Sequence, residues 1–287
     1  MAYTIAVSFD TFASNIEVSG YNRKTAKGRE NKVKSLLEDK FEILDIFSIG
    51  SIPKYTAVKN HADLDIFVIL HFSKHIKGRE PSAVLLSVKN ALKDYAVSVR
   101  RNGQAVSLSF KTWPDVDIVP VYRNVNNDKS VNHYGVPNMH TESWVKSRPR
   151  LHASKMSKRN HSDACGSKFK RVVKMAKWWN YENGGYLSSY HIEIMALDTL
   201  FNEITDYSWT IYYLFKQIQE KVHKNIHDGV AHVSSDLTSA QKEVFDQQLS
   251  NTVRRLDEAR DYITNGDNEK AIEKYRMVFG TNFPSYG

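Results

Sequence analysis

The chain has 287 residues, of which 41% are hydrophobic and 25% are charged, so it has enough apolar side chains to bury a large core. Its single cysteine, Cys165, excludes an internal disulfide and a cysteine-rich zinc cluster, so a bound metal would have carboxylate ligands. The net charge of +8 favours a polyanionic partner, such as nucleotides, nucleic acid or a membrane surface. Because no apolar run approaches a membrane span and the N-terminal MAYTIAVSFD is unlike a signal peptide, we expect a cytoplasmic protein without a membrane partner.

The first 125 residues are predicted to form mixed α and β structure. Apolar positions at helical spacing predict an amphipathic helix over residues 25–41, with basic side chains on its outer face. Runs of β-branched and aromatic residues predict strands over residues 43–49 and 62–71, and Pro81 opens a helix that continues to about residue 95. Residues 97–110 are typical of a hairpin that turns at Asn102-Gly103, and another strand begins near Val116.

After Tyr122 the sequence is polar and is predicted to form a loop until a helix begins between Asp163 and Ser167. That helix is expected to end near residue 181, and further helices are expected over residues 188–204, 208–225, 238–264 and 267–279. The sequence therefore predicts an α/β chain of two lobes. A sheet-bearing lobe would span residues 1–160, and a helical lobe would span residues 161–287.

Two carboxylates in the second predicted strand are the first candidates for a functional site. Asp63 and Asp65 are two residues apart, so on a strand they point to the same face. Such a pair is destabilising unless a cation neutralises it, and oxygen ligands of this kind suit Mg²⁺. The alternative is a pair of carboxylates on a solvated strand face.

Residues elsewhere in the N-terminal part add to this pair. Gly50 and Ser51 follow an apolar run, where a glycine lets the backbone approach a phosphate and the serine hydroxyl can bind it; the alternative is an ordinary turn. Asp115 and Asp117 lie at the start of a later strand and offer a third carboxylate. Three acids could hold two metal ions, one near an attacking hydroxyl and one near a leaving pyrophosphate.

The GS turn, the DLD sequence and the later VDIVP sequence together resemble the DNA-polymerase-β-like nucleotidyltransferases. The sequences KWW at residues 177–179, SSYHIE at 188–193 and FGTNFP at 279–284 look like those of a narrower group. That group contains the cyclic GMP–AMP synthases, the oligoadenylate synthases and the bacterial cyclic-oligonucleotide synthases of antiphage defence (CD-NTases of CBASS). The resemblance implies a polymerase-β-like core with a mixed sheet, an α-helical C-terminal lobe that closes the nucleotide cleft, and an N-terminal helix that packs across both lobes.

The resemblance also implies roles for individual residues. Asp63, Asp65 and Asp117 would be catalytic and would hold two Mg²⁺ ions, or Mn²⁺ in their place, with Asp115 as a rival for the third position. The remaining nucleotide-binding residues would be Gly50, Ser51, Lys177, Ser189 and Tyr190, of which Tyr190 would stack on a base. Lys177 as a solvated charge, Ser189 as a helix cap and Tyr190 as a core residue are the alternatives.

The chain departs from the group at two points. The group often has GSYxRxT, whereas this chain has Lys54 in place of the arginine and a bulky Tyr55 after it. A zinc cluster like that of the animal synthases cannot form with one cysteine, which favours the bacterial branch.

The function implied is the synthesis of a cyclic di- or trinucleotide messenger from nucleoside triphosphates, with a separate effector protein sensing the product. Two alternatives stay open: a template-independent nucleotidyltransferase that acts on RNA ends or a small molecule, and a non-catalytic nucleic-acid-binding protein. A structured RNA activator is a further expectation, on the analogy of the oligoadenylate synthases. It would bind an outer basic strip of six side chains, against the alternative of solvated helix faces: Lys27, Arg29, Lys32, Lys34, Lys168 and Arg171.

Overall fold

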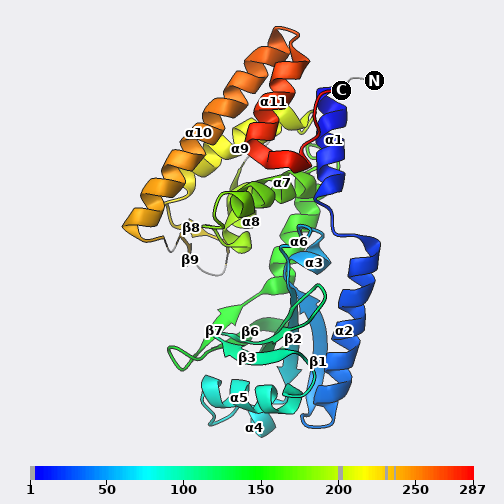
Figure 1. Ribbon diagram of the computed structural model, residues 1–287. Helices are drawn as coiled ribbons and strands as arrows, with labels where there is room; N and C mark the ends of the chain where they lie inside the picture. The colour runs from blue at the N-terminus through cyan, green and yellow to red at the C-terminus, as the bar shows by residue number, and fades with distance from the viewer. Residues whose placement is uncertain (1–3, 200–202, 230–231, 236) are drawn as a thin grey trace. The chain divides into compact units, whose positions relative to one another are not determined.

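The computed structural model describes residues 4–199, 203–229, 232–235 and 237–287, and the chain divides into two units (Figure 1). Val18–Ala153 form an α/β unit, whereas Met1–Glu17 and Ser154–Gly287 form a helical unit. The mixed α/β class expected from the sequence is confirmed. The division falls at residue 153 instead of 160, and the first segment of the chain belongs with the helical unit.

In the described part of the α/β unit, seven strands form one mixed sheet. Its order is β1-β2-β5-β4-β3, and β6 pairs with both β5 and β7. Strands β2 and β5 run parallel to each other, and the other pairs are antiparallel. The bounds are β1 Ile43–Ile49, β2 Leu64–Leu70, β3 Ser98–Asn102, β4 Ala105–Ser109, β5 Val116–Val125, β6 Val131–Asn138 and β7 Ser143–Ser147.

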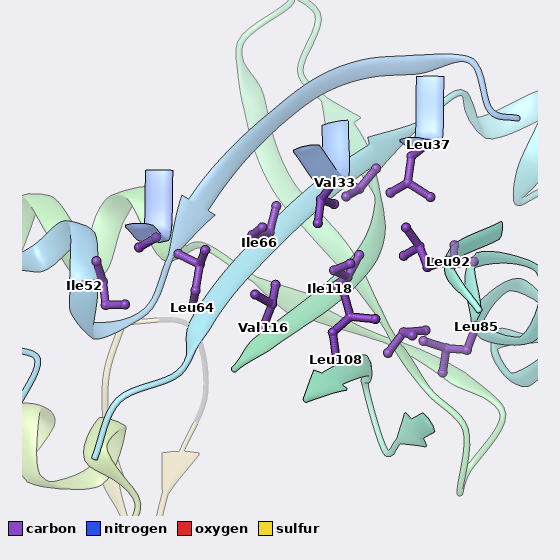
Figure 2. Packing of buried hydrophobic residues seen from close by; sticks show 14 of the residues in the cluster. Val33, Leu37, Ile52, Leu64, Ile66, Leu85, Leu92, Leu108, Val116 and Ile118 are labelled. Atoms are coloured by element: carbon purple, nitrogen blue, oxygen red, sulfur yellow. The ribbon is translucent and has the colours of Figure 1, made fainter. Parts of the chain in front are cut away.

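Two helices cover one face of this sheet: α2 (Gly20–Glu38) and α5 (Pro81–Leu92). Figure 2 shows apolar side chains of both helices packed on alternate residues of the strands. These core residues include Val33, Leu37, Leu85, Leu92, Leu64, Ile66, Val116 and Ile118. Because side chains alternate along a strand, the odd-numbered residues of β2 and β5 lie on the opposite face, where Phe67 and Val119 join a second buried cluster.

The region expected to be a loop after Tyr122 contains β6, β7 and the helix α6 (Pro149–Asn160) instead. The sequence indicated a loop because the segment is polar and contains Pro137, which lies within β6. Gly135 lies opposite Tyr122, and a Cβ there would overlap the tyrosine ring. The glycine therefore makes room for a cross-strand aromatic ring.

The predicted hairpin is present, but its turn differs from the expectation. Asn102 pairs with Ala105, so the two turn residues are Gly103 and Gln104. Gly103 has a φ of 59°, whereas Asn102 stays in the strand. The turn is therefore one residue later than the expected Asn102-Gly103, and Gly103 supplies its positive φ angle.

The helical unit consists mainly of packed helices (Figure 1). Thr238 and Gln241 form a capping box at the start of α10, which explains why this helix was predicted within a residue of its observed start. The expected helix over residues 188–204 ends at Asp198, and residues 200–202 lie outside the described part. The bounds are α1 Ile5–Asn15, α7 Phe169–Glu182, α8 Ser189–Asp198, α9 Tyr207–Lys221, β8 Ile226–His227, β9 His232–Val233, α10 Ser239–Thr264 and α11 Asn268–Phe279. Among the described residues, none of the helices combines the length and the apolar character that a membrane span requires.

Helix α1 joins the helical unit through aromatic side chains near the end of the chain. Phe9 and Phe12 are fully buried, and the ring of Phe12 lies 4.7 Å from that of Phe279 and 5.4 Å from that of Phe283. Phe9 makes an edge contact with Tyr275 at 4.8 Å. This aromatic cluster explains why the first segment belongs with a unit that is far away in the sequence.

We therefore expect Phe12→Ala to lower the free energy of unfolding by about 3–5 kcal/mol, because it leaves a cavity among buried rings. Phe72→Ala is the matched control: this phenylalanine of the short helix α4 (Phe72–His75) is 44% exposed, and its loss should cost about 1 kcal/mol or less. Urea denaturation followed by circular dichroism measures both. Equal losses would contradict the anchoring role of α1.

Candidate functional site

Two carboxylates lie side by side on adjacent parallel strands of the α/β unit. Asp65 of β2 is in register with Asp117 of β5, and both are half-buried on the face opposite to α2 and α5. Neighbouring strands are about 4.8 Å apart, so the two side chains leave the sheet next to each other. The core residues Ile66 and Ile118, also in register, fix this arrangement from below.

Asp63 adds a third negative charge directly before β2. Partial loss of water around its carboxylate raises the pKa of Asp63, and the negative charges of Asp117 and Asp115 raise it further. The structure thus brings together the acids that the sequence pattern singled out.

Asp115 is the least suited of the acids to hold a ligand. Its Oδ1 accepts a hydrogen bond from the backbone N–H of Phe110 at 2.9 Å, and its carbonyl accepts one from Leu64 at 2.9 Å. These bonds tie Asp115 to the strand connections. Asp117, in register with Asp65, is the better third carboxylate, as the family pattern indicated.

A divalent cation fits these carboxylates in one particular way. Within the described residues, no three acidic, histidine or cysteine side chains converge on a common point that would enclose a metal ion. Mg²⁺ usually binds one or two carboxylates and completes its coordination with water and substrate phosphates. The pair Asp65 and Asp117 suits that mode of binding, in which the substrate supplies the remaining oxygens.

Gly50 brings the backbone of the GS turn against the carboxylate pair. Ile49, the residue before it, is in register with Asp65, and Gly50 has a φ of 75° and a ψ of −154°. A Cβ at this position would overlap Oδ2 of Asp65. Only glycine combines this backbone conformation with this close approach. Ser51 then begins α3 (Ser51–Lys54) beside the acids.

Lys177, in the helical unit, is not a solvated charge. Its Nζ lies 2.6 Å from Oε1 of Glu193, and the two side chains are 1% and 0% exposed. Helix α7 supplies the lysine and α8 the glutamate. A buried pair of this kind fixes the two helices to each other, because either charge alone would be costly to bury.

The start of α8 places the other two candidates of the helical unit. Ser188 caps the helix by accepting from the N–H of His191 at 3.1 Å, so Ser189 is not the cap; it shares a hydrogen bond of 3.0 Å with Tyr181. Tyr190 is 38% exposed, so it is not a core residue. Its hydroxyl donates to the carboxylate of Asp228, and partial burial together with this bond raises the pKa of Tyr190.

The predicted basic strip is wrong at Arg29. This side chain is buried, donates to the carbonyl and hydroxyl oxygens of Thr112 at 2.8 and 2.7 Å, and lies over the ring of Phe110. Loss of water lowers the pKa of Arg29. Its long stem carries the guanidinium around α2 to the sheet, which a helical pattern does not reveal.

The other five members of the strip are divided between the two units. On α2, Lys32 is exposed, while Lys27 pairs with Glu30 and Lys34 pairs with Glu38. In the helical unit, Lys168 donates to the carbonyls of residues 204 and 205, and Arg171 pairs with Asp10 at 2.9 Å. Lys168 and Arg171 therefore have structural partners of their own.

Glu193 and Asp228 are functional candidates that the sequence analysis did not assign. Glu193 stands in the SSYHIE sequence, but its partner Lys177 is on another helix, and no spacing rule connects them. Asp228 lies next to a short hairpin whose two strands have two residues each, too short for a periodic signal.

The first prediction for this site concerns the buried ion pair of Lys177 and Glu193. Glu193→Gln removes the countercharge of a fully buried ammonium and should lower the free energy of unfolding by about 3–5 kcal/mol. Glu38→Gln breaks the half-exposed pair with Lys34 and should cost about 1 kcal/mol or less. Urea titrations of both variants test this, and a small loss for Glu193→Gln would show that the pair does not join α7 to α8.

A second prediction for this site follows from the raised pKa of Asp63. A carboxylate whose folded pKa exceeds its unfolded value opposes folding when it is ionised, so Asp63→Asn should raise the melting temperature at pH 7. The gain should shrink as the pH falls through the raised pKa and vanish below the ordinary value of 3.8, where both states are protonated. Thermal melts from pH 3 to pH 7 measure it; a gain that grows toward low pH would contradict the assignment.

Comparison with known proteins agrees with this geometry. Residues 3–160 match the family described as the Second Messenger Oligonucleotide or Dinucleotide Synthetase domain. A cyclic AMP-AMP-AMP synthase from Acinetobacter sp. is 24% identical over an alignment 305 residues long, gaps included. The alignment covers 98% of this chain and 86% of that protein. A probable cyclic nucleotide synthase from Bacillus cereus is 24% identical and matches over 66% of this chain and 57% of that protein.

Solved structures show the same fold. CdnC of E. coli MS115-1 with ATP has a TM-score of 0.76 at 19% identity and covers 98% of this chain and 99% of its own. CdnG of Bradyrhizobium diazoefficiens in complex with GTP has a TM-score of 0.73 at 14% identity. The match covers 96% of this chain and 94% of CdnG. The family match spans more than half of the chain. The chain therefore belongs to the family of second messenger oligonucleotide or dinucleotide synthetases, within the CD-NTases, and has their polymerase-β-like nucleotidyltransferase fold.

Proposed function

We propose that this protein joins nucleoside triphosphates into a cyclic di- or trinucleotide messenger in a reaction that depends on Mg²⁺. The observation that carries the proposal is the registered pair Asp65 and Asp117, with Asp63 and the Gly50 turn beside it. Family membership supports nucleotidyl transfer as the reaction class, and the carboxylates offer a candidate metal site for that reaction.

In each transfer a sugar hydroxyl attacks the α-phosphate of a nucleoside triphosphate. A phosphorus–oxygen bond forms, the bond to pyrophosphate breaks, pyrophosphate leaves, and the proton of the hydroxyl passes to solvent water. Asp65 and Asp117 hold the cation site, and the bare backbone of Gly50 lets phosphate oxygens approach it, with Ser51 as a hydroxyl donor. The bound Mg²⁺ would neutralise charge on the phosphates and lower the pKa of the hydroxyl. Repeating the transfer within the linear product would close the ring.

Within the helical unit, we assign nucleotide contacts to Ser189 and Tyr190. Tyr190 presents an exposed ring whose hydroxyl is fixed by Asp228, as a stacking residue requires. Lys177 is already paired with Glu193, so we assign it the support of α8 in place of a direct, solvent-exposed contact with the triphosphate.

We further propose ATP as one substrate, because related proteins are named for adenylate products or were solved with ATP. The product would act on a separate effector protein in antiphage defence. A structured RNA activator would have to bind without Arg29 of the expected strip, because that side chain is buried.

The test is product analysis from mixed ATP, GTP, CTP and UTP with Mg²⁺, by mass spectrometry and pyrophosphate release. Wild type should yield a cyclic product without an added acceptor, and the double variant Asp65→Asn, Asp117→Asn should fold but lose more than about 10²-fold in rate. Asp39→Asn, at the exposed end of α2, is the control and should retain activity. Transfer only to added RNA or a small molecule would favour a different nucleotidyltransferase. A complete lack of transfer would favour a nucleic-acid-binding protein.

A further inference from the structure

Tyr55 has a backbone conformation that bulky residues rarely adopt. It ends α3 with a φ of 59° and a ψ of 34°, in the left-handed region, where glycine or asparagine is usual at the end of a helix. Its ring is nonetheless 59% exposed. The tyrosine is therefore neither the residue that the backbone favours nor one that fills the core.

Arg23 and the backbone of α3 surround Tyr55. The guanidinium of Arg23 lies 4.6 Å from the ring centroid, and its Nη1 donates to the carbonyl of Ile52 at 3.3 Å. The N–H of Tyr55 donates to the same carbonyl at 3.1 Å, and the N–H of Thr56 donates to the backbone carbonyl of Ser51 at 3.0 Å. Arg23 thus contacts the ring, and the backbone hydrogen bonds of α3 fix the position of the Tyr55 main chain relative to the GS turn.

The position of the ring matters because α3 begins at that turn. Gly50 abuts the carboxylate of Asp65, and Tyr55 follows Ser51 after one helical turn, about 6 Å along the axis. That span is within the length of one nucleotide, measured from its phosphates to its base. A residue with a strained backbone and an exposed aromatic ring, one helical turn from a candidate phosphate site, is suited to a ligand contact.

We propose that Tyr55 is a nucleobase-stacking site for a nucleoside triphosphate whose phosphates bind at the Gly50 turn. Arg23 supports the ring from one side. The ligand class is a nucleoside triphosphate, and a purine base is favoured because its larger π-face gains more from stacking on tyrosine. This inference rests on the proposed function, since it uses the same phosphate site.

The experiment uses the full chain and three variants at one position. Tyr55→Gly and Tyr55→Asn remove the ring but suit the left-handed backbone, so the melting temperature should rise or stay unchanged. Both should weaken binding of non-hydrolysable α,β-methylene ATP roughly 5- to 100-fold by calorimetry. Tyr55→Phe keeps the ring and should bind as wild type does. Inorganic tripolyphosphate, which has no base, should bind all four proteins equally.

Each outcome decides the inference. Unchanged nucleotide affinity in Tyr55→Gly overturns it. Equal losses for the nucleotide and for tripolyphosphate also overturn it, because the residue would then only shape the turn. If wild type binds the nucleotide but forms no cyclic product, the proposed function fails and the stacking site is judged by the binding data alone. If wild type binds no nucleotide, both are wrong.

Discussion

The parallel pairing of β2 with β5 is the constraint on which the α/β unit depends. It places Asp65 and Asp117 directly beside each other, an arrangement that repulsion between like charges opposes. The opposite face of the same two strands offsets this cost, because Leu64, Ile66, Val116 and Ile118 are fully buried under α2 and α5 (Figure 2). The alternation of side chains along a strand thus separates a stabilising face from a functional one.

Local features around the pair follow from the same geometry. Gly50 must lack a side chain because Ile49 lies in register with Asp65, and the positive φ of Gly50 begins the turn into α3. Loss of water and the negative charges of Asp117 and Asp115 raise the pKa of Asp63, so the clustered negative charge is unfavourable before any ligand arrives. A cation and phosphates together would relieve that charge, which links metal binding to substrate binding.

Much of this could be predicted from the sequence where the signal is local. Strand β1 and helix α10 match their predicted bounds closely, because an apolar run and a capping box mark them. The proximity of the acids also followed from their positions at strand starts. Strands β6 and β7 were missed because Gly135 and Pro137 disguise a paired strand as a loop, and the pairing depends on Tyr122 of another strand.

The charges were harder to place than the elements, because their partners are remote in sequence. Arg29 lies on a basic helix face yet reaches Thr112, and Lys177 finds Glu193 on another helix. Helical spacing shows which face a residue occupies but does not show how far a long side chain reaches. At both positions a basic side chain that helical spacing placed on an accessible helix face is therefore buried.

The most direct test of the central claim is the binding of Mn²⁺, as a paramagnetic substitute for Mg²⁺, in the presence of α,β-methylene ATP. Electron paramagnetic resonance of wild type should show protein-bound Mn²⁺ whose signal requires the nucleotide, because the carboxylate pair supplies only part of the coordination. The same signal should be lost in Asp65→Asn, Asp117→Asn while circular dichroism shows an intact fold. Undiminished Mn²⁺ binding in that folded double variant would contradict the assignment of the pair as the metal site.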